Sequence, residues 1–170
     1  MLIHSLNRLE KPSYLPITVK EAKLYLKIDH DIEDLLIEDM IKAAVNSFED
    51  VTATALIPQV WKVIYKDIDR NIIDIPIKPV ANILNISTIN SNHQISKITN
   101  YTLINNSLFF NISFPSQILI IEFQAGTEIN FIPENIKLSL LEHIAFLYEN
   151  RGENNQFDLN IYSKFRTIKY

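Results

Sequence analysis

An imidazole stands between two carboxylates at Asp29-His30-Asp31, and this combination could bind a metal ion or exchange protons. Such sites need further ligands or partners, usually a second histidine or a carboxylate pair at helical spacing. The remaining histidines, His4, His93 and His143, are scattered along the chain. Aspartate is also preferred where helices begin, so the triplet indicates a capped joint between two helices with an exposed histidine.

Other reactive patterns are missing from the sequence. There is no cysteine, so thiolate chemistry and disulfides are excluded, and two glycines cannot form a glycine-rich phosphate loop. No Ser-His-Asp, Cys-His or HExxH arrangement is present. We therefore expect no enzymatic activity, no bound metal and no cofactor.

Composition indicates a folded, mildly acidic protein. Of 170 residues, 47% are hydrophobic and 21% are charged, which is typical of a globular domain. A net charge of -4 argues against general nucleic-acid binding, which requires a basic surface. The sequence shows neither a secretory signal nor an apolar run long enough to cross a bilayer, so we expect a soluble protein made in the cytoplasm, without membrane contact.

Two capped helices are expected near the N-terminus. Residues 1–15 have little periodicity and predict an extended arm. Thr18 and Glu21 form a capping-box pattern, which predicts a helix ending near Lys27. Asp31 with Asp34 repeats the capping pattern and predicts a second helix from about Ile32 to Val51.

The second predicted helix has an apolar face and an acidic face. At about 100° per residue, one half of the wheel carries apolar side chains, namely Ile32, Leu36, Ile37, Met40, Ile41, Ala43, Ala44, Phe48 and Val51. The opposite half carries Asp31, Asp34, Glu38 and Glu49 beside Lys42. An acidic helix face is usually simply solvated, but it can also line a channel or contact a neighbouring subunit.

From residue 57 to 126 the pattern becomes that of strands. Runs rich in β-branched and aromatic residues predict a small antiparallel sheet, with strands at 59–68, 72–77, 83–89, 101–104, 107–112 and 117–123. Asn105-Asn106 predicts a tight hairpin turn, and Trp61 is expected in the core or on a sheet face. A third helix is predicted from Pro133 to Asn150, with Gly152 as its C-cap. The fold class is therefore α+β, with the terminal helices packed together and the sheet inserted between them.

Two aromatic features could make contacts outside the domain. Phe146 falls on the polar side of the third helix, where it either contacts another subunit or is covered by the sheet or tail. Residues 153–170 form a tail that is basic at its end, and aromatic anchors mixed with cations are typical of docking segments. The candidate docking residues are Tyr162, Lys164, Phe165, Arg166 and Lys169. An unstructured end and a surface for single-stranded nucleic acid are the alternatives.

The order of these motifs resembles the head–tail connector, or portal adaptor, proteins of long-tailed phages and prophage elements. The resemblance rests on short motifs in order along nearly the whole chain, which are Pro16-Ile17-Thr18, Glu21-Ala22-Lys23, Asp29-His30-Asp31, Glu33-Asp34, Ala55-Leu56, Gln59-Val60-Trp61, residues 75–80, Ala125-Gly126, Ile132-Pro133 and residues 147–151. Two positions depart from the family pattern. Lys164-Phe165-Arg166 stands where Pro-Tyr-Arg is usual, and Ala53-Thr54-Ala55 where a glycine is common.

The resemblance implies a structural virion protein rather than an enzyme. It implies a connector domain over residues 16–152, in which Pro16, Thr18, Glu21, Trp61, Tyr148 and Arg151 are structural motif residues. Expected partners are other copies in a closed ring of about a dozen subunits, the portal protein, a tail-side stopper, and duplex DNA that passes without specific binding. The expected location is the virion head–tail junction after synthesis in the host cytoplasm. The alternative is a nucleic-acid-associated packaging or regulatory factor.

Overall fold

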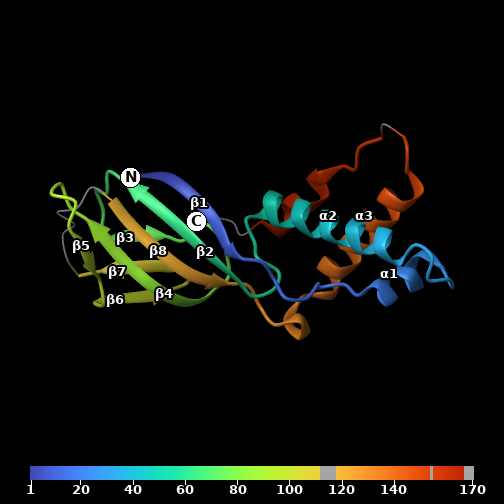
Figure 1. Ribbon diagram of the computed structural model, residues 1–170, viewed down its shortest axis with the longest axis horizontal. Helices are drawn as coiled ribbons and strands as arrows, with labels where there is room; N and C mark the ends of the chain where they lie inside the picture. The colour runs from blue at the N-terminus through green and yellow to red at the C-terminus, as the bar shows by residue number, and fades with distance from the viewer. Residues whose placement is uncertain (112–117, 154, 167–170) are drawn as a thin grey trace. The chain divides into compact units, whose positions relative to one another are not determined.

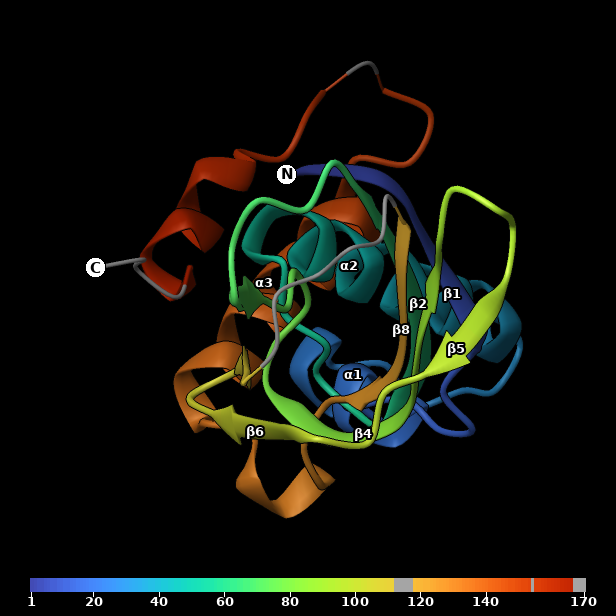
Figure 2. The ribbon, with the colours of Figure 1, turned by 90° about the vertical axis from the view of Figure 1, so that its left-hand side faces the viewer.

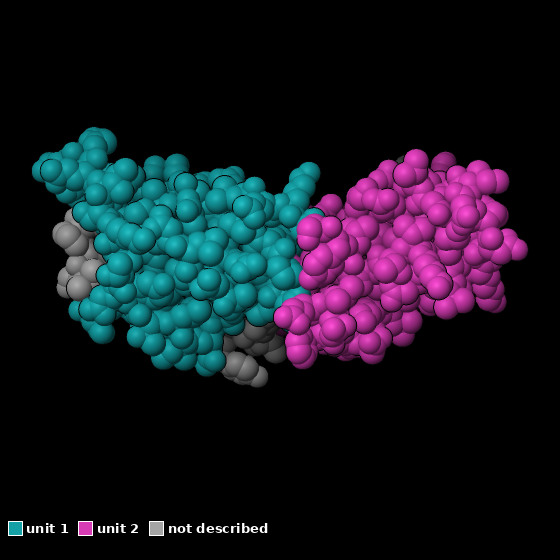
Figure 3. Space-filling view, turned by 60° about the horizontal axis from the view of Figure 1, so that its bottom comes forward, with its two compact units in different colours: residues 1–12, 58–127 teal, residues 13–57, 128–170 magenta. Residues whose placement is uncertain are grey.

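The computed structural model describes residues 1–111, 118–153 and 155–166. The chain forms two compact units, coloured separately in Figure 3. The sheet unit comprises residues 1–12 and 58–127, and the helical unit comprises residues 13–57 and 128–170. The expected α+β class, with a sheet inserted between N-terminal and C-terminal helices that pack together, is confirmed.

Three helices build the helical unit (Figure 1): α1 (Val19–Leu26), α2 (Asp34–Thr52) and α3 (Glu134–Glu149). Two 3-10 helices, η1 (Ile129–Phe131) and η2 (Leu159–Phe165), flank α3 in the sequence. The predicted capping box of α1 is confirmed, because Thr18 Oγ1 accepts from the Glu21 amide at 3.1 Å and Glu21 Oε2 accepts from the Thr18 amide at 2.7 Å. These bonds satisfy amides that have no partner within the helix.

The ends of α2 and α3 differ from the prediction. Helix α2 begins at Asp34 with Glu33 at the cap and no capping side chain, so Asp31 does not start it. Its C-cap, Ala53, adopts the left-handed conformation at φ 53°, where the family commonly has glycine. Helix α3 ends at Glu149 with Asn150 as its C-cap, and Gly152 lies two residues beyond Asn150 with φ 82°.

One hydrophobic core holds the helical unit together. It combines the buried face of α2 with side chains of α3 and one tyrosine from η2. Phe48 of α2 is completely buried and lies edge-on to Tyr162 of η2, with 4.9 Å between ring centroids. The predicted apolar face of α2 is correct in part: Val45 is buried although it was not predicted, while Ile32, Leu36 and Ala43 are exposed.

The sheet unit contains two antiparallel sheets, seen from the end in Figure 2. The first has the order β1-β2-β8-β4-β5 and the second β3-β7-β6. Their bounds are β1 (Leu2–Glu10), β2 (Gln59–Lys66), β3 (Ile72–Asp74), β4 (Val80–Ile89), β5 (Ile95–Lys97), β6 (Tyr101–Ile104), β7 (Ser107–Phe110) and β8 (Ile118–Ala125). Strand β8 buries every second residue, as the period of a strand facing a core requires.

The register of the long strands follows their side-chain pattern. Val63 of β2 pairs with Ile121 of β8 on the buried face, whereas Lys62 pairs with Glu122 on the outer face. The Lys62 ammonium lies 3.0 Å from the Glu122 carboxylate. A slip by one residue would exchange the two faces, so this alternation fixes the pairing.

Two strands were not predicted. Residues 2–10 of the expected N-terminal arm are extended, but they form β1 and pair with β2. The short strand β5 also lacked a clear pattern. The hairpin turn at Asn105-Asn106 is confirmed, since both residues have positive φ and join β6 to β7.

Candidate assembly surfaces of the helical unit

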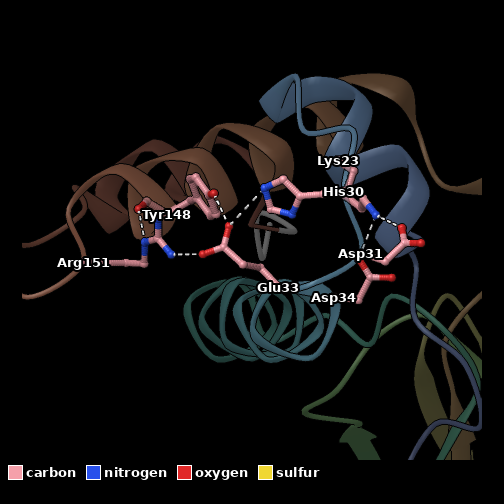
Figure 4. A network of polar contacts seen from close by, with 7 residues as sticks. All are labelled: Lys23, His30, Asp31, Glu33, Asp34, Tyr148 and Arg151. Carbon is pink, nitrogen blue, oxygen red and sulfur yellow. Dashed lines mark hydrogen bonds and ion pairs between the residues drawn. The ribbon is translucent and has the colours of Figure 1, made fainter.

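A polar clasp joins the start of α2 to the end of α3 (Figure 4). The Glu33 carboxylate accepts hydrogen bonds from the Tyr148 hydroxyl and from Arg151 Nη1, each at 2.5 Å. The Arg151 guanidinium lies 4.0 Å from the centroid of the Tyr148 ring. These partners stand 115 and 118 residues from Glu33 in the sequence. The clasp therefore fixes the joint between α1 and α2 against the last turn of α3.

The clasp also accounts for the electrostatics of Glu33. Its hydrogen bonds from Tyr148 and Arg151 hold the pKa of the carboxyl below its ordinary value. The same Glu33 carboxylate raises the pKa of the Tyr148 hydroxyl. The motif residues Tyr148 and Arg151 thus both donate hydrogen bonds to Glu33 in this chain.

The Asp29-His30-Asp31 triplet is divided between two polar clusters. His30 Nε2 lies 4.0 Å from the Glu33 carboxylate. By contrast, the Lys23 ammonium lies 2.5 Å from the Asp31 carboxylate and 2.8 Å from the Asp34 carboxylate. No group of three potential metal ligands occurs among the residues that the structure describes. The triplet is a helix joint held by ion pairs, with His30 about half exposed.

The predicted acidic face of α2 is only partly exposed. Glu38 pairs with Lys42 at 2.8 Å, and the same ammonium lies 3.1 Å from Asp39, which the prediction omitted. Glu49 does not belong to this face. Its side chain is 5% exposed and accepts the Leu56 amide at 2.8 Å, so it holds the turn that follows α2. The helical wheel misplaced Glu49 because a wheel cannot show which polar residue satisfies a buried backbone group.

Residues 157–165 pack against the polar side of α3, which carries His143 and Phe146. His143 is 4% exposed, and its Nδ1 lies 2.9 Å from the Tyr162 hydroxyl. The ring of Phe157 stacks on His143 with 3.9 Å between centroids. Phe157 also contacts Phe146, which is half-buried, so the tail covers Phe146 as one of the two alternatives proposed.

Of the predicted docking residues that the structure describes, most contact the helical unit itself. Tyr162 is completely buried in the core and is not available to a partner. Phe165 packs on Phe48 at 5.6 Å, and Arg166 Nε donates to the Val51 carbonyl at the end of α2. Lys164 is exposed beside the Phe165 ring, and Lys169 lies outside the described residues.

Comparison with known proteins identifies the family. The model of the family described as phage gp6-like head-tail connector protein matches residues 16–122 of this chain. The chain belongs to this family of head–tail connectors. It is therefore a structural head–tail connector subunit, and the clasp joins motif residues that the resemblance had singled out.

Solved structures share the fold of the connector over almost its whole length. One is described as the neck of an empty GTA particle computed with C6 symmetry, with a TM-score of 0.80, 17% identity, and coverage of 98% of this chain and 97% of the other. Another, the virion of a native gene transfer agent particle, has a TM-score of 0.76 and 18% identity, with coverage of 97% and 96%. A third is the neck of a native GTA particle computed with C12 symmetry, with a TM-score of 0.76, 18% identity and coverage of 98% and 97%. No curated protein matches the chain.

The connector also exposes three large aliphatic side chains in and between α1 and the first turn of α2, which the sequence analysis did not predict. Leu24 of α1 is 81% exposed, Ile32 is 91% exposed, and Leu35 of α2 is 80% exposed. Ile32 had been assigned to the packed face, but it precedes α2 and points away from the core. Each of the three directly follows a member of the Lys23–Asp31–Asp34 cluster in sequence.

Outside the helical unit, Trp61 lies on β2 as predicted for a sheet-face residue. The Arg8 guanidinium of β1 lies 4.8 Å from the centre of its ring, and Arg8 pairs with Trp61 in the strand register. Among the residues that the structure describes, no helix of the connector is both long and apolar enough to cross a bilayer.

Proposed function

We propose that this connector assembles as a closed ring of identical subunits between the portal and a tail-side stopper, where it extends the DNA channel. The family match over residues 16–122 carries the proposal. The particle necks that share its fold were computed with sixfold and twelvefold symmetry, which favours a ring of about a dozen copies. The protein would be made in the host cytoplasm and act in the particle neck, with no bond made or broken.

A closed ring requires that one surface of each subunit bind a different surface of its neighbour. Such an interface needs rigid elements that hold the two surfaces at a fixed distance. The helical unit has this property, because the Glu33 clasp and the Phe48–Tyr162 contact fix both ends of α2 to other elements. We infer that α2 spans the distance between two such surfaces.

The acidic side chains of α2 and of the segment before it are our candidates for a channel wall or a subunit contact. Asp31, Asp34, Glu38 and Asp39 share two ammonium groups, Lys23 and Lys42, so four negative and two positive charges leave a net charge of -2. A negative wall repels phosphates and allows duplex DNA to slide, whereas a basic wall would hold it by counterion release.

Electron microscopy of the protein mixed with its cognate portal tests the proposal. We expect closed rings seated on the portal, and mass measurement by light scattering gives the copy number. Failure to associate with itself or with the portal would refute the proposed function. The alternative, a nucleic-acid-associated factor, predicts a mobility shift of duplex DNA at low ionic strength without ring formation.

The acidic face has its own test. Glu38→Lys removes one of the two carboxylates that pair with Lys42 and changes the charge of this face by two units, so we expect weaker ring assembly. Asp50→Lys, which makes the same charge change at an exposed position near the other end of α2, is the matched control. Equal assembly of both variants would exclude Glu38 from the contact.

A further inference from the structure

One face of the five-stranded sheet has no covering layer within the sheet unit. Val63 and Tyr65 of β2 are buried, and the Tyr65 hydroxyl donates to the Asp74 carbonyl of β3 at 2.6 Å, so these side chains face the second sheet. Because successive side chains of a strand point to opposite faces, the residues between them belong to the other, outer face. Every strand that the structure describes in the sheet unit belongs to one of the two sheets, so none of them forms a third layer on the outer face.

The strand register gives this outer face a continuous aliphatic surface. Ile120 of β8 lies directly opposite Ile64 of β2 and Ser87 of β4. Ile118, two residues away on β8, belongs to the neighbouring row. Residues directly opposite one another have Cβ atoms about 5 Å apart, and residues two apart on a strand are about 7 Å apart, so neighbouring side chains touch. These two rows define the outer patch, which consists of Leu2, Lys66, Ile118, Ile89 and Ile95 in one row and Ser5, Ile64, Ile120, Ser87 and Lys97 in the other.

The outer patch is aliphatic and carries positive charge. Six of its ten side chains are Leu or Ile, two are Lys, and none is a carboxylate. Leu2 is 68% exposed and Ile95 is 72% exposed, so the patch is accessible at both edges of the sheet. The next row carries Lys62 and Glu122, which pair with each other and add no net charge. A suitable partner surface therefore combines aliphatic side chains with carboxylates.

Helix α2 exposes a stripe with this chemistry. Leu35, Asp39 and Ala43 follow one another at a spacing of four residues, and all three are exposed. Residues three or four apart lie side by side on a helix, so these side chains form one face. The α2 stripe is completed by the flanking residues Leu36, Glu38 and Lys42. The two carboxylates share the Lys42 ammonium, which leaves the stripe one negative charge.

We propose that the α2 stripe of one subunit packs on the outer patch of the next subunit, an inference that rests on the proposed ring. A helix on a sheet face is one of the stable layer arrangements of proteins. At 1.5 Å per residue, Leu35 and Ala43 are about 12 Å apart along the helix axis. Five strands at a spacing of about 4.8 Å make the patch about 19 Å wide. The stripe therefore fits within the patch, which offers its two lysines to the carboxylates of α2.

The pairing of these unlike surfaces is favoured over the pairing of like ones. Two α2 stripes would bring carboxylates together, and two outer patches would bring lysines together, so both like pairings are opposed by repulsion. The stripe belongs to the helical unit and the patch to the sheet unit, so each subunit offers two different surfaces. Such a heterologous contact closes into a ring when the rotation between subunits permits.

Disulfide mapping tests this proposal directly, because the chain has no cysteine of its own. A chain with Leu35→Cys and an affinity-tagged chain with Ile120→Cys are mixed and oxidised, with the cognate portal present and absent. We expect the mixed disulfide dimer to form about tenfold faster than with the control pair of Leu35→Cys and Thr102→Cys, because the contact raises the effective concentration of the two thiols. Thr102 is exposed on β6 of the second sheet, so it controls for random collision.

Charge reversal gives a second readout. Asp39→Lys and Lys66→Glu should each weaken association several-fold, and a chain that carries both substitutions should regain part of the loss. Because both side chains lie on the surface, circular dichroism of each variant should match that of the unchanged chain. A double variant that shows the full sum of the two losses would overturn the inference.

The outcomes separate this inference from the proposed function. Rings in which the test and control pairs link equally would overturn the inference and leave the proposed function standing. Dimers of two Leu35→Cys chains, or of two Ile120→Cys chains, that form as fast as the mixed dimer would also overturn it, because like surfaces would then meet. Absence of any assembly by the unchanged chain, with and without the portal, would refute both.

Discussion

His143 should make the helical unit lose stability in mild acid. Burial lowers the pKa of its imidazole from 6.5 to about 4. Because the folded state binds the proton less readily than the unfolded state, stability is complete above pH 6.5 and falls as the pH decreases toward 4. The side chains lining the adjacent surface are Ser47, Phe146, Leu147, Asn155, Gln156, Phe157 and Leu159, and none of them carries a charge.

The size of the effect follows from the difference between the two pKa values. Between pH 8 and pH 5 the free energy of unfolding should decrease by about 2 kcal/mol, and by about 3 kcal/mol once His143 is fully protonated. The carboxyl groups of Asp31, Glu33 and Glu21 also have lowered pKa values in the folded state. Their contribution is lost only as the pH falls below their ordinary values, so the window from pH 6.5 to pH 5 isolates His143.

Urea unfolding followed by circular dichroism at 222 nm measures this loss in the helical unit. Fluorescence of Trp61, the single tryptophan, reports on the sheet unit in the same samples. The variant His143→Gln should be less stable at neutral pH but should lose the dependence between pH 6.5 and pH 5. His93→Asn, at an exposed loop position with φ 59°, is the control and should keep the full dependence. If the free energy of unfolding of His143→Gln depends on pH as strongly as that of the unchanged chain, the pH dependence does not come from His143.

Three further substitutions test local structure by urea unfolding. Glu49→Ala leaves the Leu56 amide without its acceptor and should lower the free energy of unfolding by about 1–3 kcal/mol. Asp50→Ala, at the exposed neighbouring position, should change it little. Equal losses in the two variants would contradict the proposed role of Glu49 in holding the turn after α2. Ala53→Gly should stabilise the chain by about 1 kcal/mol because it removes left-handed strain at the C-cap, and a destabilised variant would show that the strain is absent. Thr18→Ala should lower the free energy of unfolding by about 1 kcal/mol because the capping box is lost. An unchanged free energy of unfolding would show that water replaces this hydrogen bond equally well.

Local rules predicted the elements whose determinants lie within a few residues of one another. The capping box of Thr18 and Glu21, the turn at Asn105-Asn106 and the alternation of β8 all depend on short-range chemistry, and all are found. Strand β1 was missed because its residues lack clear alternation, and their partners in β2 lie 50 to 64 residues away in sequence. Strand pairing between segments so far apart in sequence cannot be predicted from a local residue pattern.

The candidate site was predicted less well, for the same reason. A helix wheel does not show which polar residues are buried, and both His143 and Glu49 are buried. Each is satisfied by a partner that the wheel does not contain, namely Tyr162 for His143 and the Leu56 amide for Glu49. The opposite error occurred at Ile32, an apolar residue placed in the core by its angle although α2 begins two residues later.

The joint between α1 and α2 connects these observations to assembly. Lys23 holds Asp31 and Asp34 on one side of the joint, and Glu33 holds Tyr148 and Arg151 on the other. Exposed ion pairs of this kind add little to stability by themselves. They do fix the direction in which the segment between α1 and α2 presents Ile32 and Leu35. In a ring, a small error in that direction is repeated at every subunit, so precise geometry at the joint matters more for closure than for the stability of one chain.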